Sequence, residues 1–202
     1  MSGVASDAQQ PEAFEFSAEN REKMAKIMTR YPAGKQASAV LPLLDLAQRQ
    51  HGGWLPRAAM DHIAELLDMA PIRVYEVATF YSMFNLNPVG RHVVRVCTTT
   101  PCQLRGANDV ARVCRDTLGI GFGETSKDGM FTLQEVECLG ACVNAPVVWI
   151  DDDYFEDLDA ASMRRILDAL RRGEAIPAGS QAGRHRSAPA GGITTLKDQA
   201  GA

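Results

Sequence analysis

The sequence predicts an α+β protein: an N-terminal helical bundle, then a small domain built on a sheet, then an extended C-terminal arm. Three observations support this prediction. Apolar residues recur every three or four positions over residues 17–86, which is typical of amphipathic helices. Over residues 91–177, short β-branched runs alternate with helical patterns, as expected for a sheet with flanking helices. Residues 178–202 are rich in Gly, Ala, Ser and Thr, which predicts an arm without a core.

The helical bundle follows a polar, aperiodic lead, residues 1–16, for which we expect disorder. Ser17 is a suitable N-cap for the first helix, because its hydroxyl can accept a hydrogen bond from a free backbone N–H. Pro32 and Gly34 end that helix. Its apolar face consists of Met24, Ile27, Met28 and Tyr31.

Three more helices complete the predicted bundle. The second lies within residues 37–52 and the third covers residues 56–69. The fourth begins at Pro71, which suits the first position of a helix because its ring presets φ. We expect its inward face to consist of Val74, Val77, Ala78, Tyr81 and Phe84. The stretch NLNPVG, residues 85–90, then breaks the pattern.

The second domain alternates strands and helices. Three runs predict strands, and the last of them is apolar on both faces and therefore central in the sheet. These runs are HVVRVC (92–97), MFTLQEVEC (130–138) and APVVWI (145–150). We expect helices over residues 105–119 and about 159–172, with Asp159 as the N-cap of the second. Residues 119–129 are predicted to form a loop and residues 151–153 a turn.

Composition and charge exclude several classes of function. The 202 residues carry a net charge of −4, so no cationic surface is expected for nucleic acid or anionic lipid. Residues 55–77 could suggest a helix-turn-helix, but acids outnumber bases there. No apolar run reaches the roughly eighteen residues that a membrane-spanning helix needs. No Lys or Arg precedes Arg21, unlike in a secretory signal or transit peptide, so we expect a cytoplasmic protein with reduced thiols.

Four of the five cysteines form two close pairs, Cys97 with Cys102 and Cys138 with Cys142. The predicted elements place all four on loops at strand ends, where a sheet can present them to one point. Gly140 lies inside the second pair and lets the backbone pass close to a bound group. Backbone N–H groups that are free in such a loop can donate to sulfur. The pairs are therefore candidate ligands of one site.

Other residues carry less specific predictions. Cys114 lies on the apolar face of a predicted helix, so we expect a buried core thiol. The hydroxyls of residues 98–100, all Thr, can donate to sulfur or belong to an ordinary polar loop. Arg184 and Arg186 in the arm can pair with acids of a partner or remain solvated.

Several kinds of site would use two cysteine pairs. Structural disulfides fit poorly with a cytoplasmic chain long enough to fold without them. A thioredoxin-type dithiol requires a Cys-x-x-Cys motif, which the sequence lacks. Spacing alone leaves zinc and iron–sulfur about equally favoured. The context favours iron–sulfur, because zinc sites usually replace the core of much smaller units. No His neighbours a Cys as a Rieske centre would require.

The stretches VCTTTPCQLRGA and ECLGACVNAPVVWI closely resemble the thioredoxin-like [2Fe-2S] ferredoxin domain of the 24 kDa subunit family of respiratory complex I. HGGWLPRAAMDHIAELL and VYEVATFYSMF are similar to the N-terminal helical domain of that family, and RHRSAPAGGITTLK to its C-terminal tail. The resemblance covers about residues 18–197 and shows no departure at the cysteines. It implies a thioredoxin-like fold for residues 91–177.

The resemblance implies that Cys97, Cys102, Cys138 and Cys142 bind one [2Fe-2S] cluster, with two cysteines on each iron. It implies no catalytic residue in this chain, and it places FMN and NADH on a partner subunit only. The implied partners are the flavin- and NADH-binding subunit of complex I and the large iron–sulfur subunit of its peripheral arm. Neither nucleic acid nor direct insertion into a membrane is implied.

The implied function is electron transfer within the NADH-oxidising module of a proton-pumping NADH:quinone oxidoreductase, where the cluster exchanges one electron with the partner's flavin. The location would be cytoplasmic, on the cytoplasmic face of a bacterial inner membrane through the complex. Two alternatives stay open. One is the equivalent subunit of a soluble NAD-linked formate dehydrogenase or hydrogenase. The other is a zinc-stabilised scaffold module without a redox role.

Overall fold

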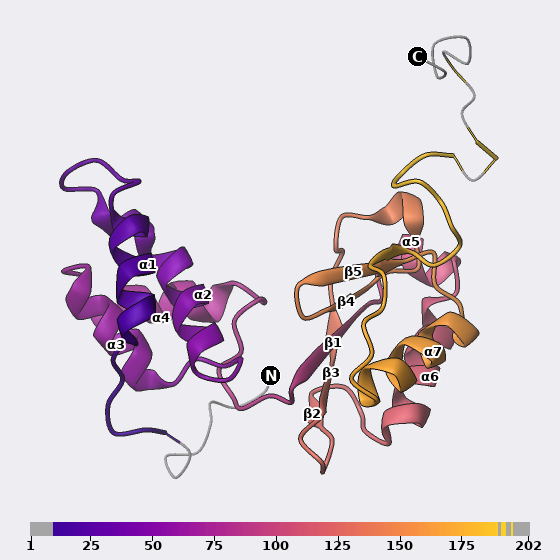
Figure 1. Ribbon diagram of the computed structural model, residues 1–202, viewed down its shortest axis with the longest axis horizontal. Helices are drawn as coiled ribbons and strands as arrows, with labels where there is room; N and C mark the ends of the chain where they lie inside the picture. The colour runs from indigo at the N-terminus through magenta and orange to yellow at the C-terminus, as the bar shows by residue number, and fades with distance from the viewer. Residues whose placement is uncertain (1–9, 190, 193–194, 196–202) are drawn as a thin grey trace. The chain divides into compact units, whose positions relative to one another are not determined.

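A computed structural model describes residues 10–189, 191–192 and 195 of the chain (Figure 1). The chain divides into two compact units between Arg91 and His92. Within the described residues, the first unit contains helices and the second contains the sheet. The predictions for residues 1–9 and for the last stretch of the arm fall outside the described residues.

The first unit is built on α-helices (Figure 1). They are α1 (Ala18–Met28), α2 (Val40–Gln50), α3 (Arg57–Leu66) and α4 (Pro71–Phe80), with a 3-10 turn at Gln36–Ala39. The Ser17 side chain caps α1 as predicted, because it accepts a hydrogen bond from the N–H of Asn20 at 3.2 Å. Apolar side chains from three helices are fully buried together, among them Leu43, Leu44, Ile63 and Val74.

The lead packs against the helices over residues 10–16, contrary to the disorder predicted as far as residue 16. Phe16 is only 2% exposed and belongs to the core of the helical unit. Phe14 contacts it edge-to-face, with ring centroids 5.3 Å apart. The Gln50 side chain also donates a hydrogen bond to the backbone carbonyl of Glu15 at 2.9 Å. Two aromatic rings bury enough apolar area to anchor a short segment, although two residues are too few to form a periodic pattern.

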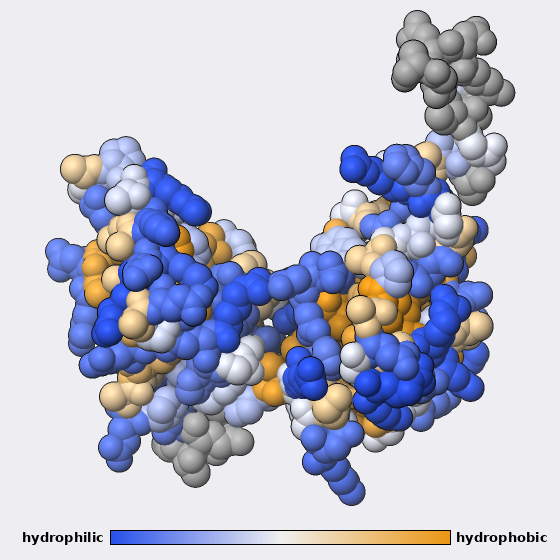
Figure 2. All heavy atoms as spheres, in the orientation of Figure 1, coloured by the Kyte–Doolittle hydropathy of each residue, from blue (hydrophilic) through white to orange (hydrophobic). Residues whose placement is uncertain are grey.

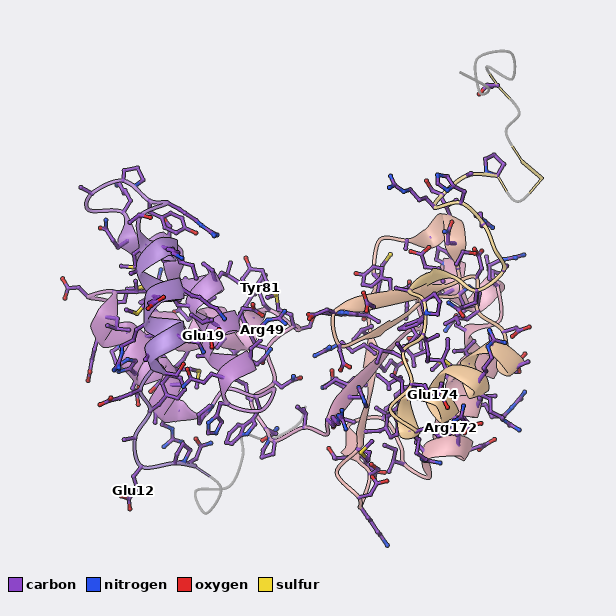
Figure 3. The ribbon with its side chains drawn as sticks, in the orientation of Figure 1. Glu12, Glu19, Arg49, Tyr81, Arg172 and Glu174 are labelled. Atoms are coloured by element: carbon purple, nitrogen blue, oxygen red, sulfur yellow. The ribbon has the colours of Figure 1, made fainter. Side chains whose placement is uncertain are left out.

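The fourth helix ends at Phe80, earlier than its apolar pattern indicates. Tyr81, which is labelled in Figure 3, has an extended backbone with ψ 118°. Its side chain is 40% exposed, so the prediction that it faces inward is wrong. Phe84 is buried as predicted, but it comes from the loop after the helix. The apolar pattern predicted too long a helix because no Pro or Gly separates Phe80 from Asn85.

The second unit is built on a mixed sheet (Figure 1). Its strands are β1 (His92–Cys97), β2 (Glu124–Thr125), β3 (Phe131–Val136), β4 (Val148–Ile150), β5 (Asp153–Glu156) and β6 (Gly179–Ser180). Their order across the sheet is β2-β3-β1-β4-β5-β6. The pairs β1–β3 and β5–β6 are parallel, and the other neighbours are antiparallel. The predicted central strand, β4, lies inside the sheet between β1 and β5.

The helices of this unit are α5 (Thr100–Leu104), α6 (Ala107–Leu118) and α7 (Ala160–Arg171). Of these, α6 and α7 lie side by side (Figure 1) and contribute to the core of the sheet unit. Asp159 caps α7 as predicted. The core joins both helices to the middle strands through buried residues such as Val94, Val110, Phe131 and Ile166. Among the described residues, the members of this core all come from the sheet unit.

The sequence pattern missed three short strands. β2 lies within the predicted loop 119–129, β5 starts at the last residue of the predicted turn 151–153, and β6 is formed by the arm. Strands of two to four residues are too short to show alternation, and their pairing is decided by neighbours distant in sequence. The arm therefore begins with a strand of the sheet, although the sequence predicted that it lies outside the folded unit.

The visible surface of each unit carries mostly hydrophilic residues, with apolar ones between them (Figure 2). In the part of the chain that the structure describes, no helix combines the length and the apolar character needed to cross a membrane.

Candidate metal centre

The parallel pairing of β1 and β3 brings the first cysteine of each pair to one edge of the sheet. Cys97 is the last residue of β1 and lies opposite Val136, the last residue of β3. Cys138 follows Val136 by two residues. Because parallel strands end at the same edge, their first cysteines meet there, as the sequence predicted.

Cys102 reaches the same place on α5, not on the predicted loop. This helix begins directly after β1, with Pro101 in its first turn, where the missing N–H costs nothing. Cys97 and Cys102 are both nearly fully buried, and the Cys102 thiol donates a hydrogen bond to Cys97. The first pair is therefore shielded from water.

The second pair lies on an exposed turn. The Sγ atoms of Cys138 and Cys142 are 3.4 Å apart, and both residues are exposed. Gly140 between them has φ +80°, a backbone conformation that favours glycine, and its N–H donates to Cys138 Sγ at 3.4 Å. Cys142 opens a short 3-10 helix, Cys142–Asn144, and the peptide bond that follows between Ala145 and Pro146 is cis.

Electrostatic interactions connect the two pairs. Cys97 acts on both Cys138 and Cys142, and Cys142 acts on Cys102. Such interactions weaken with distance, so the four cysteines that the sequence singled out lie in one region of the sheet unit.

Burial and hydrogen bonds compete in the buried pair. Burial favours the neutral thiol of Cys97, but hydrogen bonds from the hydroxyl and backbone of Thr99 and from the backbone of Leu139 lower its pKa overall. The Thr99 hydroxyl lies 3.3 Å from Cys97 Sγ, so one of the predicted hydroxyl partners of sulfur is present. Burial, together with the hydrogen bond to Cys97, raises the pKa of Cys102 to about 12.

In the exposed pair too, the pKa of one thiol is lowered and that of the other is raised, but here hydrogen bonds are the leading cause. The N–H of Gly140 lowers the pKa of the Cys138 thiol, and the hydrogen bond from Cys142 adds to this effect. That hydrogen bond to Cys138 raises the pKa of Cys142. In each pair, the pKa of one thiol is therefore lowered and that of the other is raised.

Two pairs of thiols suit a group that contains two metal ions. A [2Fe-2S] cluster asks for two protein ligands at each iron, and thiolates are its usual ligands. The donors at Cys97 and Cys138 are of the kind that orient and tune such ligands. The residues present fit this group.

The remaining thiol stays outside the site. Cys114 is fully buried in the core of the sheet unit, where burial raises its pKa to about 12. This agrees with its prediction as a core residue.

Sequence analysis did not predict a group of polar residues beside the exposed turn, which consists of Asn144, Asp157 and Arg184. Arg184 of the arm pairs with Asp157 of the same chain at 2.9 Å, and it also contacts Asn144. No sequence signal marks this group, because its members lie up to 40 residues apart and follow no repeat.

The fold and the site define the class of this protein: a thioredoxin-like α+β protein with an all-cysteine site suited to a binuclear metal cluster. The profile of the family described as thioredoxin-like [2Fe-2S] ferredoxin matches residues 24–171. The chain belongs to this family, and its cofactor is accordingly a [2Fe-2S] cluster. The resemblance seen in the cysteine motifs is thereby confirmed.

Named relatives agree with this family. The chain is 55% identical over 158 residues to an NADH-quinone oxidoreductase subunit of Rickettsia bellii, covering 78% of this chain and 95% of that protein. It is 50% identical over 185 residues to the mitochondrial NADH dehydrogenase [ubiquinone] flavoprotein 2 of Dictyostelium discoideum, covering 91% and 74%. Among solved structures, an NAD+-reducing [NiFe]-hydrogenase in the air-oxidised state shares the fold, with a TM-score of 0.56 and 20% identity over 66% of this chain and 23% of that chain.

Proposed function

We propose that this chain is the electron-transfer subunit of the NADH-oxidising module of an NADH:quinone oxidoreductase. The observation that carries the proposal is the 55% identity to the Rickettsia bellii oxidoreductase subunit over 95% of that protein's length. The chain contributes a site for one cluster and no catalytic residue of its own. When bound, a [2Fe-2S] cluster supplies one-electron chemistry, because it takes up and releases electrons singly.

The proposed ligands are Cys97 and Cys102 on one iron and Cys138 and Cys142 on the other. The hydrogen bond within the first pair and the 3.4 Å separation within the second support this division. Burial of the first pair shields one side of the site, and exposure of the second leaves the other side open. We expect the electron partner to approach on the side of Cys138 and Cys142, because electron transfer weakens steeply with distance.

The proposed partners are a flavin- and NADH-binding subunit and a large iron–sulfur subunit of the same complex. FMN and NADH are assigned to the partner because the sequence has no Gly-rich phosphate loop after a strand. The proposed location is cytoplasmic, at the inner face of a bacterial membrane through these partners.

Anaerobic purification of the full chain tests the proposal directly. We expect two irons and two sulfides per chain and an S = 1/2 EPR signal that appears only after reduction with dithionite. Cys138→Ser and Cys142→Ser should alter or abolish the signal, whereas Cys114→Ala, outside the site, should preserve it. A colourless chain that holds one zinc and gives no signal after anaerobic reconstitution would contradict the proposal and support the scaffold alternative.

Affinity purification from the source organism separates the two redox assignments. A subunit of NADH:quinone oxidoreductase should co-purify with quinone-reducing membrane subunits. Recovery of a nickel or molybdenum subunit instead would assign the chain to a hydrogenase or formate dehydrogenase.

A further inference from the structure

The C-terminal arm lies against the turn that carries Cys142. We propose that Arg184 is a positioning residue of the cluster site, whose guanidinium ties the arm to the Cys142–Asn144 turn and fixes that turn. The inference rests on the proposed function, because Cys142 is a proposed ligand. It assigns a role to residues of the arm that the family's cysteine motifs do not contain.

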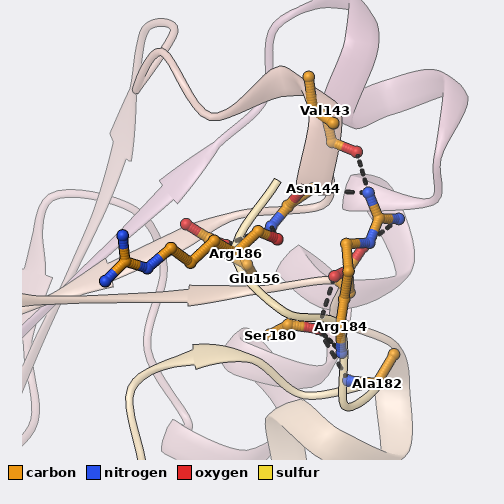
Figure 4. Close-up of polar contacts among 8 residues, drawn as sticks. Val143, Asn144, Glu156, Ser180, Ala182, Arg184 and Arg186 are labelled. Carbon is orange, nitrogen blue, oxygen red and sulfur yellow. Dashed lines mark hydrogen bonds and ion pairs between the residues drawn. The ribbon is translucent and has the colours of Figure 1, made fainter. Parts of the chain in front are cut away.

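The guanidinium of Arg184 makes three contacts at once, and those with Val143 and Asn144 can be followed in Figure 4. Its Nη1 donates to the backbone carbonyl of Val143 at 3.0 Å and to Asn144 Oδ1 at 3.1 Å. Its Nη2 lies 2.9 Å from Asp157 Oδ1. A planar fork with several fixed donors can bridge such groups, whereas a lysine ammonium acts as a point charge. Arg184 therefore joins the turn, the arm and the end of β5.

Asn144, one of the residues that Arg184 contacts, makes several further hydrogen bonds (Figure 4). It is 4% exposed, and its Nδ2 donates to Glu156 Oε2 at 2.6 Å and to the backbone carbonyl of Arg186 at 2.8 Å. Its own carbonyl accepts from the N–H of Asp157 at 2.7 Å. A buried amide whose donors and acceptors are all used specifies one conformation of the backbone that carries it.

The arm is anchored before it reaches Arg184. Strand β6 pairs with β5, and Ser180 Oγ donates to Asp157 Oδ2 at 2.6 Å. The same hydroxyl accepts from the N–H of Arg184 at 3.1 Å. Asp157 thus receives hydrogen bonds from two arm residues, and the backbone position of Arg184 is set independently of its guanidinium.

The ion pair between Arg184 and Asp157 is largely buried. The side chains of Arg184 and Asp157 are 15% and 7% exposed. Removal of one partner from a buried pair leaves an uncompensated charge in a poorly solvated place. The pair is neutral as it stands, so each single substitution changes the charge beside the turn in a known direction.

Arg184 is connected to the cluster site through the backbone of the turn. Val143, whose carbonyl Arg184 binds, directly follows Cys142, which is exposed. Two backbone hydrogen bonds of the turn are short-range, from Asn144 N–H to the Ala141 carbonyl at 2.9 Å and from the next N–H to the Cys142 carbonyl at 3.3 Å, and a third joins the Asn144 carbonyl to the end of β5. Side-chain contacts from the arm add to this hold on the turn and on the ligand that it carries. The potential of an iron–sulfur cluster also responds to nearby charge and to hydrogen bonds at its sulfurs.

Hydrogen exchange of the full chain, with and without reconstituted cluster, tests the positioning role. In Arg184→Gln, the amides of residues 140–145 should exchange roughly tenfold faster than in the natural chain, because charged hydrogen bonds to the turn are lost. Arg186→Gln is the matched control. It removes the same charge from the same arm, but this side chain is exposed and points away from Arg184 (Figure 4), and the Arg186 carbonyl remains. Equal exchange in both variants would overturn the proposal.

Reduction potentials give a readout that a merely structural role would not produce. Arg184→Gln leaves the Asp157 carboxylate without its cation and should lower the potential of the cluster, since added negative charge disfavours reduction. Asp157→Asn leaves the guanidinium without its anion and should raise it. Arg184→Lys keeps the charge, so its potential should stay near the natural value while exchange in the turn still accelerates. Shifts in the same direction for the first two variants would contradict the proposal.

The two proposals fail in different ways. If the natural chain binds no [2Fe-2S] cluster, the proposed function fails, yet the exchange comparison still decides whether Arg184 holds the turn. If the cluster is present and Arg184→Gln matches Arg186→Gln in exchange and potential, the function stands and the positioning role fails. If Arg184→Gln does not fold, Asp157→Asn and Arg184→Lys decide the same question.

Discussion

At the residue scale, the Thr99 hydroxyl is one of the groups that distinguish the two thiols of the buried pair. The Thr99 side chain lies 3.3 Å from Cys97 Sγ and contributes to the lowered pKa of that thiol. Hydrogen bonds to cluster sulfur stabilise the more negative, reduced state. Thr99→Val keeps the shape and removes the donor, so we expect a lower reduction potential, measured by redox titration with EPR detection.

Thr98 provides the control at this scale. Its hydroxyl donates to Glu135 Oε1 at 2.7 Å and not to a thiol. Thr98→Val should therefore leave the potential unchanged. An equal shift in Thr98→Val and Thr99→Val would mean that the hydroxyl of Thr99 has no specific effect on the cluster.

At the scale of elements, α7 depends on one carboxylate at its N-terminus. Asp159 Oδ1 accepts from the N–H of Ser162 at 2.7 Å, and Ser162 Oγ accepts in return from the N–H of Asp159 at 2.9 Å. Loss of such a cap costs about 1 kcal/mol. Asp159→Ala should lower the free energy of unfolding by about this amount in urea titrations. An unchanged free energy would show that α7 is held by packing alone.

The pH dependence of this cap has a definite sign. The N–H and hydroxyl of Ser162 lower the pKa of Asp159 below its ordinary value. Its contribution is therefore complete above the pKa of the unfolded chain and is lost as the pH falls through the lower, folded pKa. Asp159→Asn does not titrate. The stability advantage of the natural chain over Asp159→Asn should shrink in urea titrations as the pH is lowered from about 6 toward about 3.

The same scale shows where sequence reasoning succeeds. α6 and α7 repeat apolar residues over three turns, and β1 and β3 each have six residues, so local pattern defines them. β2 and β6 have two residues each and exist only because a neighbouring strand pairs with them. The four cysteines were identifiable because their chemistry and spacing are unusual. Asn144, Asp157 and Arg184 are common residues whose role arises only from tertiary contacts.

At the scale of the whole molecule, each unit has a core of its own. The helical unit buries residues such as Leu43 and Ile63, and the sheet unit buries residues such as Val94 and Phe131, in separate clusters. A unit with its own core can fold alone. All four proposed ligands and the Arg184 contacts belong to the sheet unit.

We therefore expect a fragment of residues 92–202 to fold and to bind the cluster without the helical unit. Iron and sulfide content and the EPR spectrum of the reduced fragment should match those of the full chain. A fragment of residues 92–178 lacks β6 and Arg184, and it should lose its cluster faster during aerobic incubation. Failure of the longer fragment to bind a cluster would show that the site needs the helical unit. Equal loss rates for both fragments would mean that the arm adds nothing to the retention of the cluster.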